Sequence, residues 1–311
     1  MSQDITKKQH YVWRRYLGAW KNNPSDKDLW TGFINTKEVK KVALMGVAQS
    51  SFFYKLEELN DFELRFLKLF NEHLSPCVRQ MSDVLYTGYV AFTQLKRNIA
   101  TGLVKMDSDY EHQVKKIETT SIEAVQSHFE LMGDDLLNCT SIDDIEKHAP
   151  EKEYEFLYYL MVQYLRTKAR KDSFVSSLTE RSDLMGVGEK CWPYFNFVVA
   201  MQMVESFVVK KDYRFVFVKN TSTLPFITGD QPVINSLGHI TDDNGYAKEL
   251  ELYYPTSPSS ALMVSFNPGE KFSEVEVDEI FVRAHNQLIA NESQLHLFAN
   301  GEQVLKDVLS V

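Results

Sequence analysis

The sequence is poor in cysteine, and its few cysteines form no recognisable motif. The 311 residues contain three cysteines, Cys77, Cys139 and Cys191, which are odd in number and far apart. This spacing excludes a Cys-x-x-Cys pair, a disulfide framework and a zinc ribbon, and it is typical of a protein in a reducing compartment.

Long apolar runs are also missing. Residues 1–10 are polar and lack the apolar region of a signal peptide, and no stretch approaches the run of about 20 apolar residues that a membrane span requires. We therefore expect a cytoplasmic protein with no membrane partner. Glycine and proline are scarce, at 13 and 9 residues, while 44% of residues are hydrophobic. This composition excludes disordered, collagen-like and low-complexity proteins.

Basic residues are outnumbered, and the net charge of −9 excludes a general nucleic-acid coating protein, which needs a broad basic surface. The deficit is uneven along the chain. Residues 7–41 hold nine basic and three acidic residues, whereas residues 105–155 hold five basic and fourteen acidic ones. The basic N-terminal arm, together with Arg166, Lys168, Arg170 and Lys171, predicts a focused basic site for a nucleic acid or nucleotide.

Helical periodicity dominates the middle of the chain. Apolar residues recur at three- and four-residue steps from Leu56 to about Met132, and again between residues 141 and 170, where Pro150 is expected to break the pattern. An apolar helix is expected at 195–208. A closing helix is predicted to begin at Ser273-x-x-Glu276, a capping-box spacing, and to reach Leu295.

Alternating apolar residues and turn signals indicate strands towards both ends of the chain. The strands are expected at 29–34 and 35–39, which form a hairpin, and at 213–218, 224–228, 250–254 and 261–266. The predicted class is α+β, with a helical body and a small, mainly antiparallel sheet built from both ends of the chain. We expect a single unit over 1–311, with an N-terminal arm and hairpin at 1–55, the helical body at 56–209, and strands with the closing helix at 210–311.

Motifs that identify common enzymes are absent from the sequence. It contains no phosphate loop, no Gly-x-Gly-x-x-Gly, no Gly-x-Ser-x-Gly and no His-Glu-x-x-His. Any catalytic or binding site must therefore be assembled by the fold from scattered polar residues.

The first candidate segment is 9–16, Gln-His-Tyr-Val-Trp-Arg-Arg-Tyr. His10 can transfer a proton near neutral pH, and Arg14 beside it can hold a phosphate ester. The alternative is a segment whose histidine and aromatic residues simply pack on the body while Arg14 and Arg15 face solvent.

The second candidate segment is 163–171, where helical spacing places Gln163, Arg166 and Arg170 on one face beside an apolar stripe. Arginines at the boundary of a core need anionic partners. The partner is either a ligand phosphate or carboxylate, or an acidic side chain of the protein itself.

The third candidate is Asp230, at the end of an expected strand and in a Gly-Asp turn within 225–235. An aspartate at the end of a strand is a common general base, metal ligand or arginine partner. The alternative is an Asx turn, in which the carboxylate bonds its own backbone.

Together these segments resemble the prokaryotic family numbered 4238 among the domains of unknown function. Its members carry Gln-His-Tyr-Val-Pro near the start and Phe-Ile-Thr-Ser-Asp-Asn-Pro-Val later, and this chain has similar motifs at 9–13 and 226–233. Residues 52–54, 163–167, 254–258 and Asn286 are also similar to what the family shows, so the resemblance spans nearly the whole chain. Trp13 replaces the family's proline, and Gly229 and Gln231 replace its serine and asparagine.

The resemblance implies a pocket of mixed charge but no known reaction. His10, Arg166 and Asp230 are the predicted catalytic residues. The predicted substrate-binding residues are Gln163, Arg170, Arg14, Ser257 and Asn286. An acid–base histidine, anion-binding arginines and an orienting aspartate suit phosphodiester cleavage without a metal. Asp230 with other acids could instead hold one Mg²⁺, but the sequence has no acidic pair at a convincing ligand spacing.

Three functions are therefore open. The first is a nuclease-like hydrolase of RNA, DNA or a nucleotide, in the toxin or phage-defence setting suggested by the family. The second is a module that binds a nucleotide or another anion without turnover. In the third, the motif residues form a buried polar network that fixes the N-terminal segment to the sheet.

Overall fold

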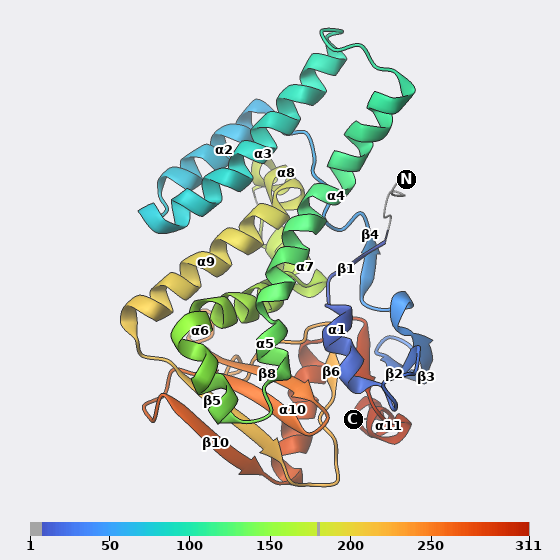
Figure 1. Ribbon diagram of the computed structural model, residues 1–311, viewed down its shortest axis with the longest axis vertical. Helices are drawn as coiled ribbons and strands as arrows, with labels where there is room; N and C mark the ends of the chain where they lie inside the picture. Colours follow the sequence, from blue (N-terminus) through green and yellow to red (C-terminus); the bar gives the residue numbers. More distant parts are fainter. Residues whose placement is uncertain (1–7, 179–180, 311) are drawn as a thin grey trace.

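The computed structural model describes residues 8–178 and 181–310, without the side chains of residues 182 and 183. Helices form most of one end of the molecule, and the larger sheets lie at the other (Figure 1). This arrangement confirms the predicted α+β class with a helical body. The helical body consists of α2 (Asp61–Glu72), α3 (Pro76–Ala100), α4 (Ser108–Met132), α5 (Asp134–Asn138), α6 (Ile142–Leu165), α7 (Lys168–Ser177), α8 (Ser182–Lys190) and α9 (Trp192–Lys210).

Helix α9 lies at the centre of this body because its sequence is apolar on nearly every face. A helix that is hydrophobic all round is stable only when other elements cover it. Most side chains in the first three turns of α9 are buried, and α6 and α3 pack against the helix.

The strands form three sheets instead of one. Strands β1 (Lys8–His10) and β4 (Gln49–Ser51) form an antiparallel pair. A five-stranded sheet has the order β10 (Phe272–Val277), β5 (Arg214–Asn220), β9 (Ser260–Ser265), β8 (Glu251–Ser257) and β7 (Ile234–Asn235), and only its β10–β5 pair is parallel. An antiparallel four-stranded sheet has the order β3 (Glu38–Ala43), β2 (Asp28–Phe33), β11 (His296–Ala299) and β6 (Thr228–Gly229).

The four-stranded sheet combines both halves of the chain, as the sequence predicts. Strands β2 and β3 form the expected hairpin, although residues 35–37 lie in its turn and the second strand begins only at Glu38. Strand β11, from near the other end of the sequence, pairs between β2 and β6. Helices α10 (Glu279–Glu292) and α11 (Glu302–Ser310) flank β11 in the sequence, and α11 contacts both β2 and β11.

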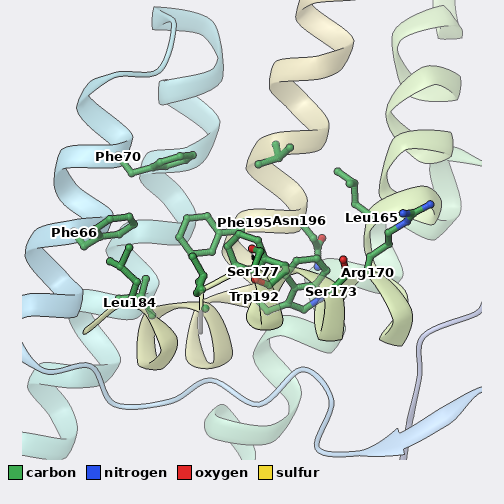
Figure 2. Close-up of a pocket in the computed structure, with 15 residues that line it drawn as sticks. Phe66, Phe70, Leu165, Arg170, Ser173, Ser177, Leu184, Trp192, Phe195 and Asn196 are labelled. Atoms are coloured by element: carbon green, nitrogen blue, oxygen red, sulfur yellow. Dashed lines mark hydrogen bonds between the residues drawn. The ribbon is translucent and has the colours of Figure 1, made fainter. Parts of the chain in front are cut away.

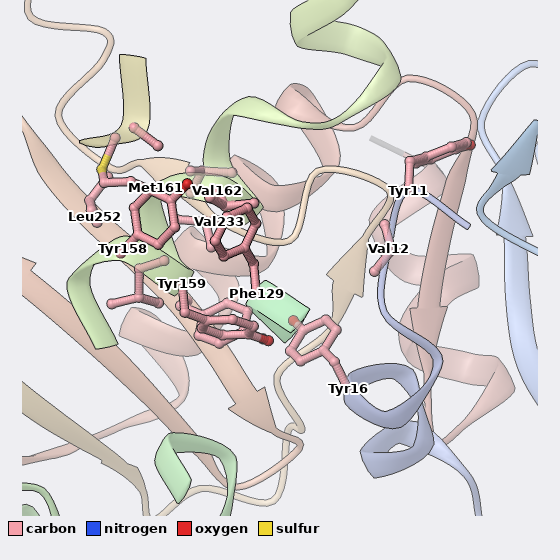
Figure 3. Close-up of a cluster of buried hydrophobic side chains, with 14 of the residues drawn as sticks. Tyr11, Val12, Tyr16, Phe129, Tyr158, Tyr159, Met161, Val162, Val233 and Leu252 are labelled. Carbon is pink, nitrogen blue, oxygen red and sulfur yellow. The ribbon is translucent and has the colours of Figure 1, made fainter. Parts of the chain in front are cut away.

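The N-terminal segment is anchored in the core by aromatic residues. It contains α1 (Arg14–Leu17) and the short 3₁₀ helix at Gly18–Trp20, and a second 3₁₀ turn lies at Leu44–Gly46. Tyr16 stacks on Tyr254, with the ring centroids 4.8 Å apart, and its hydroxyl donates to the carbonyl of Pro255 at 2.8 Å. Figure 3 shows Tyr16 facing Tyr159 of the helical body, whereas Val12 and Tyr11 lie farther along the N-terminal segment.

The capping-box prediction at Ser273 is wrong. Residues 272–277 form strand β10, which pairs with β5, and the helix begins only after Asp278. The Asp278 carboxylate accepts a hydrogen bond of 3.1 Å from the amide of Phe281, so Asp278 is the N-cap. Leu295 lies beyond the end of α10.

Two details of the 141–170 prediction are also wrong. Pro150 does not end the helix, because α6 continues through it to Leu165. Burial of the long apolar segment 156–162 offsets the one backbone hydrogen bond that a proline removes. The helix ends at Arg166, and Thr167 caps α7 by accepting from the amide of Arg170 at 3.4 Å. Gln163, Arg166 and Arg170 therefore do not share one helical face.

Candidate functional site

A side chain in the first strand fixes the N-terminal segment against α4. Gln9 is fully buried, and its amide donates to the carbonyl of Thr119 in α4 at 2.6 Å. The Gln9 side-chain oxygen accepts from the backbone amide of Tyr54 at 2.7 Å. Successive strand residues point to opposite sides, so inward-facing Gln9 leaves the next residue, His10, on the other side. There His10 lines a cavity.

The His10 cavity has a volume of about 430 Å³, which is within the range of small-molecule sites. One wall is a stripe of polar residues on α4, where Glu123, Gln126, Ser127 and Glu130 recur at helical spacing. The N-terminal segment and the loop after β4 complete the lining with His10, Trp13, Arg14, Arg15 and Tyr54, and Leu131 of α4 closes it.

Several buried polar atoms around this cavity have no hydrogen-bond partner among the described residues. They are His10 Nδ1, the Tyr54 hydroxyl and both side-chain polar atoms of Gln126. Gln126 is only 2% exposed. Buried polar atoms are nearly always paired with protein, water or ligand, so unpaired atoms of three lining residues make this cavity a candidate site for a bound water or ligand.

Arg166 lies behind the cavity wall and connects the N-terminal segment to α4. Its guanidinium is fully buried, and Nε donates to the carbonyl of Tyr11 at 2.8 Å while Nη1 donates to Glu130 Oε1 at 2.8 Å. The carbonyl belongs to the N-terminal segment and Glu130 to α4. Nη2 is buried without a partner among the described residues. Arg166 therefore positions the lining residue Glu130 but does not itself line the cavity.

The electrostatic environment keeps His10 neutral at pH 7. Burial, reinforced by the positive charges of Arg14 and Arg166, lowers the pKa of its imidazole to about 4, whereas the Val47 backbone opposes the shift. Glu123 has a raised pKa, chiefly because of burial and partly because of the negative charge of Glu130. Burial also raises the pKa of the Tyr54 phenol, which remains protonated.

Asp230 is not part of the His10 cavity, contrary to the prediction that it joins His10 and Arg166 in one pocket. Its carboxylate is buried and accepts hydrogen bonds from three consecutive backbone amides, those of Gln294 and Leu295 at 2.8 Å and that of His296 at 3.2 Å. Burial raises its pKa to about 6, and these three amides oppose the shift. The structure therefore places Asp230 as a support for the segment that enters β11.

Two of the predicted substrate-binding residues lie in the C-terminal part of the fold and bond to their own surroundings. Asn286 accepts from the amide of Ile227 at 3.0 Å and donates to the carbonyl of Pro225 at 2.9 Å. The Ser257 hydroxyl bonds with the hydroxyl of Ser260 at 2.7 Å in the β8–β9 hairpin. Neither residue lines the His10 cavity.

The remaining three predicted residues are divided among different places. Arg14 lines the His10 cavity and contacts the sulfur of Met45. Arg170 forms an ion pair of 3.0 Å with Glu292 and lines a different, apolar pocket. Gln163 is buried with neither amide atom paired among the described residues, and it lines neither of these two cavities.

The sequence motifs nevertheless meet in space. Gln9 of the first motif bonds the backbone of Tyr54, and Arg166 bonds the backbone of Tyr11. Thr167, next to Arg166, donates to Gln231 of the third motif. The motifs therefore form one connected polar network, of which the His10 cavity occupies the side facing α4.

Sequence reasoning missed the α4 residues Glu123 and Gln126. In the sequence these residues form a polar stripe on a predicted helix, and such a stripe is equally typical of an ordinary helix face in contact with solvent. Only the burial of Gln126 separates the two interpretations, and burial depends on the position of the N-terminal segment.

Within residues 8–178 and 181–310, no cluster of three or more His, Cys, Asp or Glu residues could hold a metal ion. No helix in the described part of the chain is long and apolar enough to cross a membrane. No protein-family model, no curated protein and no solved structure matches this chain, so the resemblance to family 4238 stays a prediction.

Proposed function

We propose that the protein binds a nucleotide or another small phosphate ester in the His10 cavity and hydrolyses a phosphodiester bond there. The observation that carries this proposal is the set of unpaired polar atoms of His10, Tyr54 and Gln126 around a cavity of about 430 Å³. A phosphate ester offers acceptors for Tyr54 and the Gln126 amide. The cationic Arg14 lines the same cavity and can contact its negative charge.

The chemistry assigned to each residue follows from its protonation state. Neutral His10 accepts the proton of a water molecule as the water oxygen attacks phosphorus. The leaving oxygen takes a proton from Glu123, whose raised pKa increases its protonated share. Arg14 and the protonated Tyr54 hydroxyl donate to the phosphate oxygens, where negative charge develops in the transition state.

The test is hydrolysis of bis(p-nitrophenyl) phosphate, an RNA oligomer and single-stranded DNA by the purified protein. His10→Asn keeps a polar side chain of similar size but removes the base, and we expect a loss of about 100-fold or more in rate. His112→Asn, at an exposed position on the same helix that lines the cavity, is the matched control and should keep full activity. Unchanged hydrolysis and cell toxicity in both His10→Ala and Arg166→Ala would refute the proposal.

Binding without turnover is the second candidate, and one observation favours it. A base with a pKa of about 4 is weak at neutral pH, which slows proton transfer but leaves binding unaffected. Titration calorimetry with the dinucleotide ApA, whose two nucleosides are joined by one phosphodiester bond, combined with chromatography of the mixture, distinguishes the two functions. Heat of binding without product supports a nucleotide-binding module, and product formation supports the hydrolase.

The toxin or phage-defence setting can be tested with the same variants. If hydrolysis of cellular nucleic acid is the function, expression of the wild-type protein should slow bacterial growth, whereas His10→Asn should not. Equal growth inhibition by both proteins would separate any toxicity from the His10 cavity.

A further inference from the structure

A second cavity lies within the helical body and is distinct from the His10 cavity. It has a volume of about 470 Å³ and lies where α2, α7, α8 and α9 meet, and it shares no lining residue with the His10 cavity. Figure 2 shows its aromatic lining, to which α2 contributes Phe66 and Phe70, and α9 contributes Trp192 and Phe195. Most of the lining is apolar, so the aromatic pocket suits a ligand with an apolar body.

The apolar wall contains one side chain that packing does not explain. Asn196 is 1% exposed, and neither its side-chain oxygen nor its side-chain nitrogen has a hydrogen-bond partner among the described residues. Figure 2 shows this side chain extending from α9 towards Trp192 and Ser173. A buried amide that is left unpaired destabilises the folded protein, so a partner inside the pocket is expected.

A second unpaired donor lies one helical turn away. Trp192 Nε1 is buried and has no partner in the described part of the chain. Phe195 and Asn196 lie three and four residues after Trp192, and Val199 lies three residues after Asn196, so all four share one face of α9. This face of α9 therefore presents two donor groups and one acceptor to the pocket.

The charge near the pocket is already neutralised. Arg170 also lines the pocket, and its Nε is buried without a partner among the described residues, but its Nη2 forms an ion pair of 3.0 Å with Glu292 and the guanidinium lies over the Tyr164 ring at 4.5 Å from the centroid. In Figure 2 the guanidinium lies away from Asn196 and Trp192. The free acceptor of Asn196 also requires a donor from the ligand, and an ionised carboxylate has none. An uncharged ligand fits both observations better than an anion.

We propose that the aromatic pocket binds an uncharged molecule with an aromatic body and an amide-like edge, in which a hydrogen-bond donor lies beside an acceptor. The Asn196 amide pairs with both groups of that edge, and Trp192 Nε1 donates to the remaining lone pair of its acceptor. The aromatic rings of α2 and α9 cover the body of the ligand. This site is independent of the function proposed for the His10 cavity.

The test compares 2-naphthamide, 2-methylnaphthalene and 2-naphthoate as ligands of the full-length protein by fluorescence titration. The amide should bind about tenfold more tightly than the hydrocarbon, which is the size of effect expected from about 1.4 kcal/mol of added hydrogen bonding. It should also bind more tightly than the carboxylate. Equal binding of all three, tighter binding of the carboxylate, or no binding would overturn the proposal.

Two variants assign the effect to the named atoms. Asn196→Leu should remove the preference for the amide while retaining hydrocarbon binding, and Trp192→Phe should reduce that preference. Gln126→Leu is the matched control, because it replaces another buried, unpaired amide in the His10 cavity and should leave the preference unchanged. If Asn196→Leu does not fold, an unchanged preference in Trp192→Phe still contradicts the proposed contacts.

Discussion

At the scale of single residues, Asp230 is a buried carboxylate that accepts hydrogen bonds from the backbone. Three consecutive amides, from Gln294 to His296, point at its two oxygens. A carboxylate can satisfy several such donors, whereas an asparagine has a single acceptor oxygen and turns an amide group towards the remaining donors. The support that Asp230 gives to the segment before β11 therefore depends on its carboxylate.

We expect Asp230→Asn to reduce the free energy of unfolding by about 2 kcal/mol, because hydrogen bonds to a buried charged group are lost. Thermal or urea denaturation measures this change. Asp242→Asn is the matched control, since Asp242 also accepts from two backbone amides but lies in an exposed turn. Its effect should be below about 0.5 kcal/mol. Equal effects of both substitutions would contradict the role assigned to Asp230.

His10 should make stability depend on pH in the acidic range. Burial lowers its folded-state pKa from 6.5 to about 4, so the unfolded chain binds more protons than the folded protein between these values. Stability from this group is therefore present above pH 6.5 and is lost as the pH falls towards 4. Because the ring is only partly buried and solvent screens it, we expect a contribution of about 1 kcal/mol.

The measurement is urea denaturation of the wild type and His10→Asn at several pH values from 7 to 4. The difference in unfolding free energy between the two proteins should change in favour of the variant as the pH falls. His112→Asn, which replaces an exposed histidine, should follow the wild-type curve. A constant difference between wild type and His10→Asn would show that this histidine is not held in its neutral form.

At the scale of elements, the boundary between β10 and α10 shows where a local motif is not sufficient. Ser273 and Glu276 have capping-box spacing, but the same segment alternates and pairs with β5 over six residues. Asp278 then provides the N-cap of α10. Pairing with β5 therefore determines where β10 ends, and the N-cap of α10 is Asp278, two residues after Glu276.

Substitutions at the two candidate caps should therefore have unequal effects. Asp278→Ala should cost about 1 kcal/mol of stability, as is usual for loss of an N-cap. Ser273→Ala should cost less than about 0.5 kcal/mol, because the buried Ser273 hydroxyl has no hydrogen-bond partner among the described residues. Chemical denaturation of both variants provides the comparison, and a larger loss from Ser273→Ala would contradict the assigned boundary.

Elements with strong periodicity could be predicted from the sequence, whereas their ends and contacts could not. The β2–β3 hairpin and helix α9 follow directly from alternating or apolar patterns. The end of α6 at Arg166 and the start of α7 depend on the Thr167 N-cap and on the bond between Arg166 and the N-terminal segment. That segment lies more than 150 residues earlier in the sequence. Such distant contacts leave no local periodicity.

The candidate site was predictable only in part for the same reason. His10 and Arg14 were recognisable as residue types with suitable chemistry, and both line the cavity. Asp230 has equally suitable chemistry, but its three backbone partners occupy it. Whether a polar residue faces a cavity or the backbone is determined by packing between elements that are far apart in the sequence.

At the scale of the whole molecule, the four-stranded sheet makes the N-terminal hairpin depend on β11. Phe298 is fully buried in β11 and lies opposite Thr31 of β2 and Thr228 of β6. Phe298→Ala should lower the unfolding free energy by about 3 kcal/mol, because it removes a large core side chain. We expect near-ultraviolet and far-ultraviolet circular dichroism to shift together, as in a single unit.

The expectation would be contradicted if the near-ultraviolet and far-ultraviolet transitions of Phe298→Ala separated, so that the helices melted at the wild-type temperature. Val275→Ala is a suitable control because Val275 is 39% exposed in β10, and the loss there should be below about 1 kcal/mol.

The position of β11 also affects how the protein can be made. A ribosome synthesises the β2–β3 hairpin first, yet the strand that covers the free side of β2 emerges more than 250 residues later. During that interval the nascent chain has an unpaired strand edge, a feature that promotes association with other chains. Productive folding in the cell therefore depends on protecting that edge, by a chaperone or by the newly made helical body, until residues 296–299 have been translated.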